Sequence, residues 1–170
     1  MARVYRQLPS PELLWELFDY KPLTGELVWR KVPSNRVRLG TATGSTHIQG
    51  YAATRVEGVS YLTHRLVWCW LHGQDPQLFQ VDHIDGNRQN NHWNNLRLAT
   101  AAENARNSKV RKHNKTGIKG TRLLPSGKYQ VRIRKDGITY QLGTFATLEE
   151  AGAAYQKAAM QLHGKFFRVR

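Results

Sequence analysis

The stretch Val81-Asp82-His83-Ile84-Asp85-Gly86-Asn87 decides how the chain is interpreted. Its first three residues predict a strand, and the glycine with its polar neighbours predicts a loop. Leu96-Arg97-Leu98 predicts a strand that returns. Thr100-Ala101-Ala102-Glu103 has the pattern of a capping box that opens a short helix. The order strand, loop, strand, helix is therefore expected across residues 81–107.

Three polar side chains of this segment have the chemistry needed to hydrolyse a phosphodiester. The carboxylate of Asp82 and the amide oxygen of Asn104 suit Mg²⁺ or Mn²⁺, one ion per active site, because hard cations prefer oxygen ligands. A neutral His83 imidazole can take a proton from the attacking water, an effect worth roughly 10²–10⁴ in rate. Neighbours on a regular strand point to opposite faces, so Asp82 and His83 serve one phosphate only if the strand distorts.

The whole pattern resembles the HNH nucleases found as free-standing or intron-encoded homing enzymes in phages, over roughly residues 15–107. The motifs that carry the resemblance are Phe18-Asp19-Tyr20, Thr24-Gly25-Glu26-Leu27-Val28-Trp29, His64-Arg65-Leu66, the stretch 81–87, Asn90-Asn91, Asn94-Asn95-Leu96-Arg97 and Glu103-Asn104. The resemblance implies a site-specific DNA endonuclease. It also implies that Asn95 tethers the loop and so orients His83, although an ordinary turn asparagine is an alternative. Related enzymes often have histidine where this chain has Asn104, which argues against a tightly bound catalytic zinc.

Other residues near this pattern allow more than one interpretation. Asp85 is expected to be a turn residue rather than a second metal ligand, and His64 could equally serve packing or contact a phosphate. Arg88 and Arg97 are expected to anchor phosphates. The single cysteine, Cys69, excludes an intramolecular disulfide framework and a multi-cysteine zinc site, and its apolar neighbours predict a small buried side chain.

Charge is distributed unevenly along the 170 residues. Residues 105–170 contain 15 Lys and Arg against 3 Asp and Glu, whereas residues 1–104 contain 11 against 9. This asymmetry predicts a polyanion bound mainly by the C-terminal part. Residues 107–116 are polar and basic without periodicity, which predicts a linker; extended at about 3.3 Å per residue it reaches about 33 Å, close to one turn of DNA.

The C-terminal part has the pattern of three strands and a helix. Strands are expected over 119–124, 128–135 and 138–142, separated by the turn signals Ser126-Gly127 and Asp136-Gly137. A helix follows from Thr147 to Leu162, with its small and apolar residues on one face. The expectation is a three-stranded antiparallel sheet packed against one helix.

The ordered spacing of residues 117–170 resembles the ERF (APETALA-type) DNA-binding domain, a module of plant transcription factors that is also found fused to phage HNH nucleases. The motifs that carry this resemblance are Gly117-Ile118-Lys119-Gly120-Thr121-Arg122, the strand 127–134, Leu142-Gly143-Thr144-Phe145, Glu149-Glu150-Ala151, Ala154-Tyr155 and Leu162-His163-Gly164. The resemblance implies that the sheet enters the major groove of DNA. Ser126 and Gln141 stand where the plant pattern has groove-facing residues, which puts the plant target sequence in doubt. The residues expected to bind DNA are Arg88, Arg97, Lys109, Arg111, Lys112, Lys119, Arg122, Lys128, Arg132 and Arg134, with Gln141 as a secondary candidate.

The sequence therefore predicts an α+β protein: a small ββα-metal (HNH) nuclease unit with N-terminal β-hairpins, and a three-stranded antiparallel sheet with one packed helix. The expected domains are a nuclease over 1–106, a basic linker over 107–116 and a DNA-binding domain over 117–170. The protein is expected to be a monomer that nicks double-stranded DNA without a small-molecule cofactor. Its expected location is the cytoplasm, that of a host cell if the gene belongs to a phage. No membrane helix is visible, and residues 1–5 lack the apolar core of a signal peptide. The alternatives are a non-catalytic DNA-binding regulator and a basic RNA-binding or ribosome-associated protein.

Overall fold

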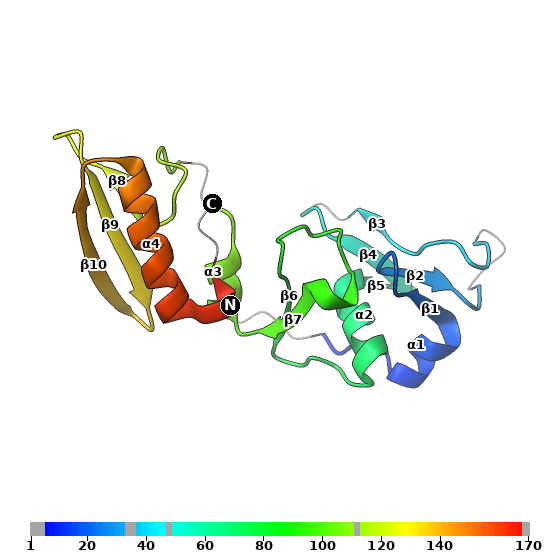
Figure 1. Ribbon diagram of the computed structural model, residues 1–170. Helices are drawn as coiled ribbons and strands as arrows, with labels where there is room; N and C mark the ends of the chain where they lie inside the picture. Colours follow the sequence, from blue (N-terminus) through cyan, green and yellow to red (C-terminus); the bar gives the residue numbers. More distant parts are fainter. Residues whose placement is uncertain (1–5, 33–36, 47–48, 111–112, 168–170) are drawn as a thin grey trace. The chain divides into compact units, whose positions relative to one another are not determined.

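The computed structural model describes residues 6–32, 37–46, 49–110 and 113–167. The chain divides into two compact units, Met1–Ala101 and Ala102–Arg170, coloured from blue to green and from green to red in Figure 1. The expected mixed α/β character is confirmed. Residues 1–5, on which the signal-peptide interpretation depended, lie outside the described part. Nowhere in the described ranges does a helix combine the length and apolar character that crossing a bilayer demands.

The first unit contains two helices whose ends follow local sequence signals. Helix α1, Pro11–Leu17, begins after Ser10, whose hydroxyl accepts a hydrogen bond from the Leu13 amide. A serine before a proline at the first helical position is a favoured helix start. Helix α2, Thr63–His72, ends at Gly73, whose φ of 64° is the left-handed conformation that glycine adopts readily.

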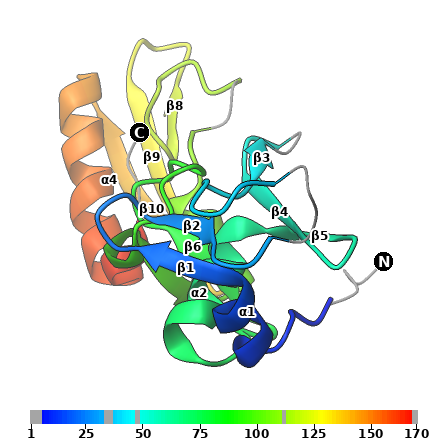
Figure 2. The same ribbon diagram turned by 90° about the vertical axis from the view of Figure 1, so that its right-hand side faces the viewer.

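The strands described in the first unit pair into small antiparallel groups. They are β1 (Phe18–Lys21) with β2 (Glu26–Trp29), β3 (Ser45–Thr46) with β4 (Ala52–Val56) and β5 (Val59–Leu62), and β6 (Gln80–His83) with β7 (Leu96–Ala99). The β4–β5 hairpin turns at Glu57 and Gly58, whose φ angles are 47° and 79°. Two positive φ angles define the type I′ turn that matches the twist of the paired strands. Helix α2 packs against β4, β5 and β6, and Figure 2 shows it below these strands.

One apolar core holds these elements of the first unit together. Leu14, Phe18, Leu27, Leu66 and Val67 are at most 1% exposed. Burying a side chain of this size stabilises a fold by roughly 1.5–3 kcal/mol. Because the core draws on both helices and the β1–β2 hairpin, it fixes the base from which β6 extends. All five tryptophans of the chain belong to this unit.

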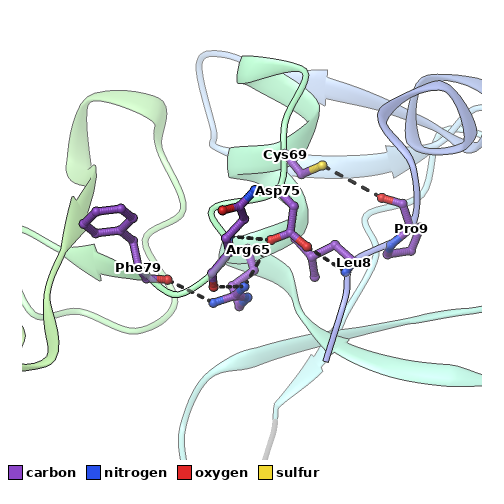
Figure 3. A network of polar contacts seen from close by, with 7 residues as sticks. Leu8, Pro9, Arg65, Cys69, Asp75 and Phe79 are labelled. Carbon is purple, nitrogen blue, oxygen red and sulfur yellow. Dashed lines mark hydrogen bonds and ion pairs between the residues drawn. The ribbon is translucent and has the colours of Figure 1, made fainter. Parts of the chain in front are cut away.

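A polar network holds the segment between α2 and β6 in place (Figure 3). Oδ2 of Asp75 accepts a hydrogen bond of 2.9 Å from the Leu8 amide, and Oδ1 lies 3.4 Å from Nη2 of Arg65. Nη1 of Arg65 donates to the carbonyl oxygen of Phe79 at 3.3 Å. The network ties the N-terminal stretch, α2 and the approach to β6 to one another.

Cys69 is fully buried on α2, as expected from its apolar neighbours. Its Sγ lies 3.9 Å from the carbonyl oxygen of Pro9 (Figure 3). Burial, helped by the nearby carboxylates of Asp75 and Glu12, raises the pKa of the thiol to about 11. The thiol is therefore protonated and has a packing role.

The second unit is a three-stranded sheet covered by one long helix. Its elements are α3 (Ala101–Asn107), β8 (Thr121–Leu123), β9 (Tyr129–Lys135), β10 (Ile138–Phe145), α4 (Leu148–His163) and the short 3-10 turn η2 (Gly164–Phe166). The strands are antiparallel in the order β10-β9-β8. Val131 and Ile133 of β9 are at most 3% exposed and pack under Ala151, Tyr155 and Ala159 of α4. Thr147 and Glu150 form a complete capping box at the start of α4.

Two contacts attach α3 to the second unit. Nη2 of Arg106 lies 3.0 Å from Oδ1 of Asp136 in the β9–β10 turn, and Nζ of Lys119 donates to the Arg106 carbonyl oxygen at 2.6 Å. The division of the chain therefore falls after Ala101. The sequence pattern placed the nuclease boundary at residue 106 instead, and that functional boundary stays a prediction.

Candidate functional site

The candidate site is built on the β6–β7 hairpin and the loop that joins its strands. Asp82 pairs with Arg97 and His83 with Leu96, without a shift of register. Val81 and Leu96 anchor the two strands in the core. Residues directly opposite on antiparallel strands share a face, and successive residues alternate. Asp82 and His83 therefore start on opposite faces, and the distortion that the sequence interpretation required is not visible in the register.

Asp82 forms a buried ion pair with the residue opposite it. Nε and Nη2 of Arg97 lie 2.9 Å and 2.8 Å from Oδ2 of Asp82, and the two residues are 8% and 5% exposed. Arg97 was expected to contact DNA. In the structure its guanidinium is buried and paired with the carboxylate of Asp82, the expected metal ligand. A charge-assisted pair of this geometry is strong when both partners are desolvated.

The loop after His83 takes its shape from its own side chains. The Asp85 carboxylate accepts from the Asn87 amide at 2.7 Å, the Asn87 side chain accepts from the Gln89 amide at 3.1 Å, and the Asn90 side chain accepts from the His92 amide at 3.3 Å. Each contact spans two residues, the spacing of an Asx turn. Successive turns of this kind replace regular secondary structure in this loop.

Asp85 acts within the loop as an organiser. Partial desolvation opposes its ionisation, but hydrogen bonds from the Asn87 amide and from the Asn90 and Asn95 side chains lower the pKa of this carboxyl overall. Nδ2 of Asn90 lies 2.8 Å from Oδ2 of Asp85. These contacts agree with the turn role expected for Asp85.

Asn95 bonds the two ends of the loop together. Its Oδ1 accepts from the Asp85 amide at 3.0 Å, and its Nδ2 donates to the Asn90 carbonyl oxygen at 2.8 Å. Its backbone oxygen also accepts from the Ile84 amide at 2.8 Å. The side chain is 7% exposed. These bonds give Asn95 the means to tether the loop, and its effect on His83 stays a prediction.

His83 lies at the end of β6 and is 4% exposed. Its Nε2 is 2.9 Å from Oδ1 of Asn91, which is 6% exposed. Burial lowers the pKa of His83, while the Asn91 bond and the nearby carboxylates of Asp85 and Asp82 act in the opposite direction. The ring is therefore neutral at physiological pH. Asn91 belongs to the Asn90-Asn91 motif, but nothing in the spacing showed which asparagine of the loop reaches the imidazole.

Two rings pack beside His83. The His64 ring stands edge-on with centroids 4.9 Å apart, and the Tyr51 ring lies 6.0 Å away. His64 is 4% exposed, and its Nδ1 has no hydrogen-bond partner among the described residues. Burial lowers the pKa of His64 to about 3, with His83 and Arg65 adding to the effect. Of the two roles left open for His64, the structure favours packing.

Arg88 is the exposed cation of this site. Its guanidinium carbon lies 4.6 Å from the centroid of the Tyr51 ring, and Nη1 donates to the Gln49 carbonyl oxygen. A cation over an aromatic face is held in place without losing access to solvent. Arg88 therefore remains available to an anion beside the loop.

A metal ion bound near Asp82 would depend on oxygen ligands. Among the residues that the structure describes, no three His, Cys, Asp or Glu side chains cluster as a metal site. The remaining ligands of such an ion would be amide oxygens, backbone carbonyls or water, which Mg²⁺ and Mn²⁺ accept readily. Asn104, the second expected ligand, lies on α3 in the second unit.

The second unit presents a basic sheet face and an open groove. Arg132 and Arg134 alternate with the buried Val131 and Ile133, and the strand register puts Arg122 and Gln141 on the same side as Arg132. The groove has a volume of about 850 Å³ and runs between the 102–114 segment and the sheet. The cations that line it are Arg106, Lys109, Lys119, Arg122, Arg132 and Arg134. Lys128 is exposed before β9, and Arg111 and Lys112 lie outside the described residues.

Comparison with known proteins identifies relatives of the first unit. The HNH endonuclease family matches residues 61–106. The uncharacterized HNH endonuclease L560 of Acanthamoeba polyphaga mimivirus is 36% identical over 104 residues, which cover 61% of this chain and 54% of that protein. Protein 3.8 of Escherichia phage T7 is 33% identical over 108 residues, which cover 63% of this chain and 88% of that protein. The match to the mimivirus relative thus spans about half of that protein's length. No solved structure matches the chain significantly.

A further relative is a plant transcription factor. The ethylene-responsive transcription factor RAP2-11 of Arabidopsis thaliana is 47% identical over 60 residues, which cover 34% of this chain and 24% of that protein.

The matched segment 61–106 contains α2, the β6–β7 hairpin and its asparagine-rich loop, so the candidate site falls inside the family's own region. The protein class is accordingly that of a mixed α/β protein with an HNH motif. The chain belongs to the HNH endonuclease family.

Proposed function

We propose that the chain is a metal-dependent DNA endonuclease of the homing type, which nicks one strand of double-stranded DNA per active site. The observation that carries the proposal is the buried His83, held at the end of β6 by Asn91. A neutral imidazole fixed in one orientation is suited to act as a general base. The family name supports the reaction class.

In the proposed reaction, His83 accepts the proton of the water that attacks the phosphorus atom. Asp82 and Asn104 would hold one Mg²⁺ or Mn²⁺, which would supply charge stabilisation for the leaving oxygen. Asn95 tethers the loop that carries the base. Arg88, exposed over Tyr51, provides a cation for a phosphate beside the loop. Arg97 pairs with the Asp82 carboxylate from the opposite strand.

The second unit supplies affinity for double-stranded DNA. Arg122, Arg132 and Arg134 share one face of the sheet, and guanidinium groups suit both phosphates and the guanine edge. The similarity to a plant transcription factor supports an ERF-type DNA-binding domain over 117–170, joined by the basic linker 107–116. Lys109, Lys119 and Lys128, with Arg111 and Lys112 of the linker, add contacts to phosphates. The protein acts as a monomer, so one binding event gives one nick.

The test is nicking of supercoiled plasmid by the full chain with Mg²⁺, with Mn²⁺ and with EDTA. Cleavage is expected with either ion and none with EDTA. His83→Ala should slow nicking by about 10²–10⁴-fold with DNA affinity almost unchanged. Arg132→Ala with Arg134→Ala should instead weaken DNA binding and reduce its salt dependence. Equal nicking by wild type and His83→Ala would refute the proposed role of the histidine.

A second candidate function is a non-catalytic DNA-binding regulator. The observation that favours it is the Asp82–Arg97 pair, which gives the carboxylate a structural partner. This candidate predicts tight DNA binding by the second unit and no nicking under any of the metal conditions. The same plasmid assay therefore separates the two functions.

A further inference from the structure

Asn91 makes a contact with His83 that determines which ring nitrogen carries the proton. Oδ1 of Asn91 and Nε2 of His83 are 2.9 Å apart, and both residues are buried. An amide oxygen can only accept a hydrogen bond. In the neutral ring Nε2 must therefore donate, which leaves the lone pair on Nδ1. The opposite tautomer would set two desolvated lone pairs against each other, an arrangement that buried groups avoid.

The rings beside His83 restrict its orientation. His64 stands edge-on at 71° with centroids 4.9 Å apart, and Tyr51 lies against both histidines. A half-turn of the imidazole would replace Nε2 by a carbon atom at the Asn91 oxygen and break the hydrogen bond. Packing and the hydrogen bond therefore favour the same ring orientation.

Asn91 is itself held by a distant part of the chain. The Tyr20 hydroxyl on β1 donates to the Asn91 carbonyl oxygen at 3.2 Å, a contact across 71 residues. In the β1–β2 turn, a Cβ on Gly25 would lie 2.7 Å from the Asn91 carbonyl carbon. The Asn91 amide donates to the Gln89 carbonyl oxygen at 3.1 Å. These contacts fix the acceptor before any substrate binds, which is the condition for preorganisation.

We propose that Asn91 is a positioning residue that fixes neutral His83 as the Nε2–H tautomer, so that Nδ1 is the nitrogen that takes the proton from water. The inference rests on the proposed nuclease function for its kinetic consequence, but not for the tautomer itself. In this arrangement Asn95 shapes the loop, whereas Asn91 sets the chemistry of the base. Functional histidines are commonly oriented by a hydrogen-bond partner at the second ring nitrogen. Loss of that partner typically lowers activity by about 10–100-fold.

The direct test is a long-range ¹H–¹⁵N correlation spectrum of the full chain with ¹⁵N-labelled histidine, with His83 assigned by His83→Gln. The wild type should show the Nε2–H pattern for His83. Asn91→Ala should lose the pattern, and Asn91→Asp should keep it because a carboxylate also accepts. Asn94 provides the matched control, since its Oδ1 lies 2.7 Å from Nδ1 of a different, half-buried histidine, His92. Asn94→Ala should leave the His83 signals unchanged.

The kinetic test compares the same variants in plasmid nicking. Asn91→Ala should lower kcat by about 10–100-fold with DNA affinity unchanged, and Asn91→Asp should recover part of that loss. A wild-type Nδ1–H pattern, or an Asn91→Ala variant with unaltered spectrum and rate, would overturn the inference. The wild-type spectrum decides even if Asn91→Ala fails to fold. A wild type that shows Nε2–H but never nicks would refute the nuclease and support the tautomer assignment.

Discussion

Gly25→Ala tests whether the β1–β2 turn supports the 85–95 loop of the candidate site. Gly25 has φ 76°, and a Cβ there would lie 2.4 Å from the His92 amide nitrogen and 2.7 Å from the Asn91 carbonyl carbon. Left-handed backbone costs a residue with a Cβ about 1–2 kcal/mol. Forcing an extra carbon against backbone that cannot rotate away adds about 1–3 kcal/mol. The variant should therefore lose about 2–5 kcal/mol of unfolding free energy.

Gly58→Ala is the matched control, because Gly58 also lies in a hairpin turn with φ 79°, but a Cβ there would have no heavy atom within 4 Å. It should lose only the conformational part, about 1–2 kcal/mol. Urea unfolding followed by tryptophan fluorescence measures both, since all five tryptophans belong to the first unit. Plasmid nicking should also be slower in Gly25→Ala than in Gly58→Ala, because the clash at residue 25 displaces Asn91. Equal stability losses in the two variants would show that the turn does not press on the loop.

Two further predictions concern buried polar groups of the first unit. Burial lowers the pKa of His64 to about 3, so below pH 6.5 the unfolded chain binds a proton at this position that the folded chain does not. Stability should therefore fall as the pH drops from about 6.5 towards 3, and His64→Gln should lose part of that slope in urea titrations at several pH values; an identical slope would contradict a buried neutral His64. Asp75→Ala removes the acceptor of the Leu8 and Gln77 amides and the partner of Arg65, and should cost about 1–3 kcal/mol in the same unfolding assay. Asp75→Asn keeps an acceptor oxygen and should cost less, and the reverse order would disprove the role of the network.

Elements with local signals could be predicted from the sequence. The helix expected from Thr147 begins there as α4, and Ser10 with Pro11 before α1 and Gly73 after α2 are local signals of the same kind. Paired turn residues such as Asp136-Gly137 placed the β9–β10 hairpin, whose turn has φ 50° and 85°. In each case the backbone conformation depends on residues within one turn of each other.

Strand ends were predicted less well, because they depend on the neighbouring strand. The strand expected over 119–124 is Thr121–Leu123, since Gly120 has φ 67°, outside the extended conformation of a strand, although its carbonyl oxygen still accepts from the Arg132 amide at 2.9 Å. The strand expected over 138–142 continues to Phe145 through an irregularity between Gln141 and Gly143. A bulge of this kind keeps two strands paired beyond the point where strict alternation ends.

The partners within the site required coordinates. The motif indicated Asp82 and His83, but the register that sets Arg97 opposite Asp82 depends on the length of the loop between the strands. Asn91 was one of several asparagines of similar spacing, and only the folded loop brings its oxygen to Nε2 of His83. His64 and Tyr51 come from other parts of the chain, so no local pattern connected them to His83.

The Asx turns of the 85–95 loop have a consequence for how activity can be controlled. They rely on short contacts, mostly between uncharged amides, which dissolved ions screen little. Attraction between basic side chains and phosphates, in contrast, weakens steeply as counterions are added. For the proposed nuclease, higher salt should therefore release the protein from DNA while the 85–95 loop keeps its shape, and dilution of the salt should restore binding without refolding.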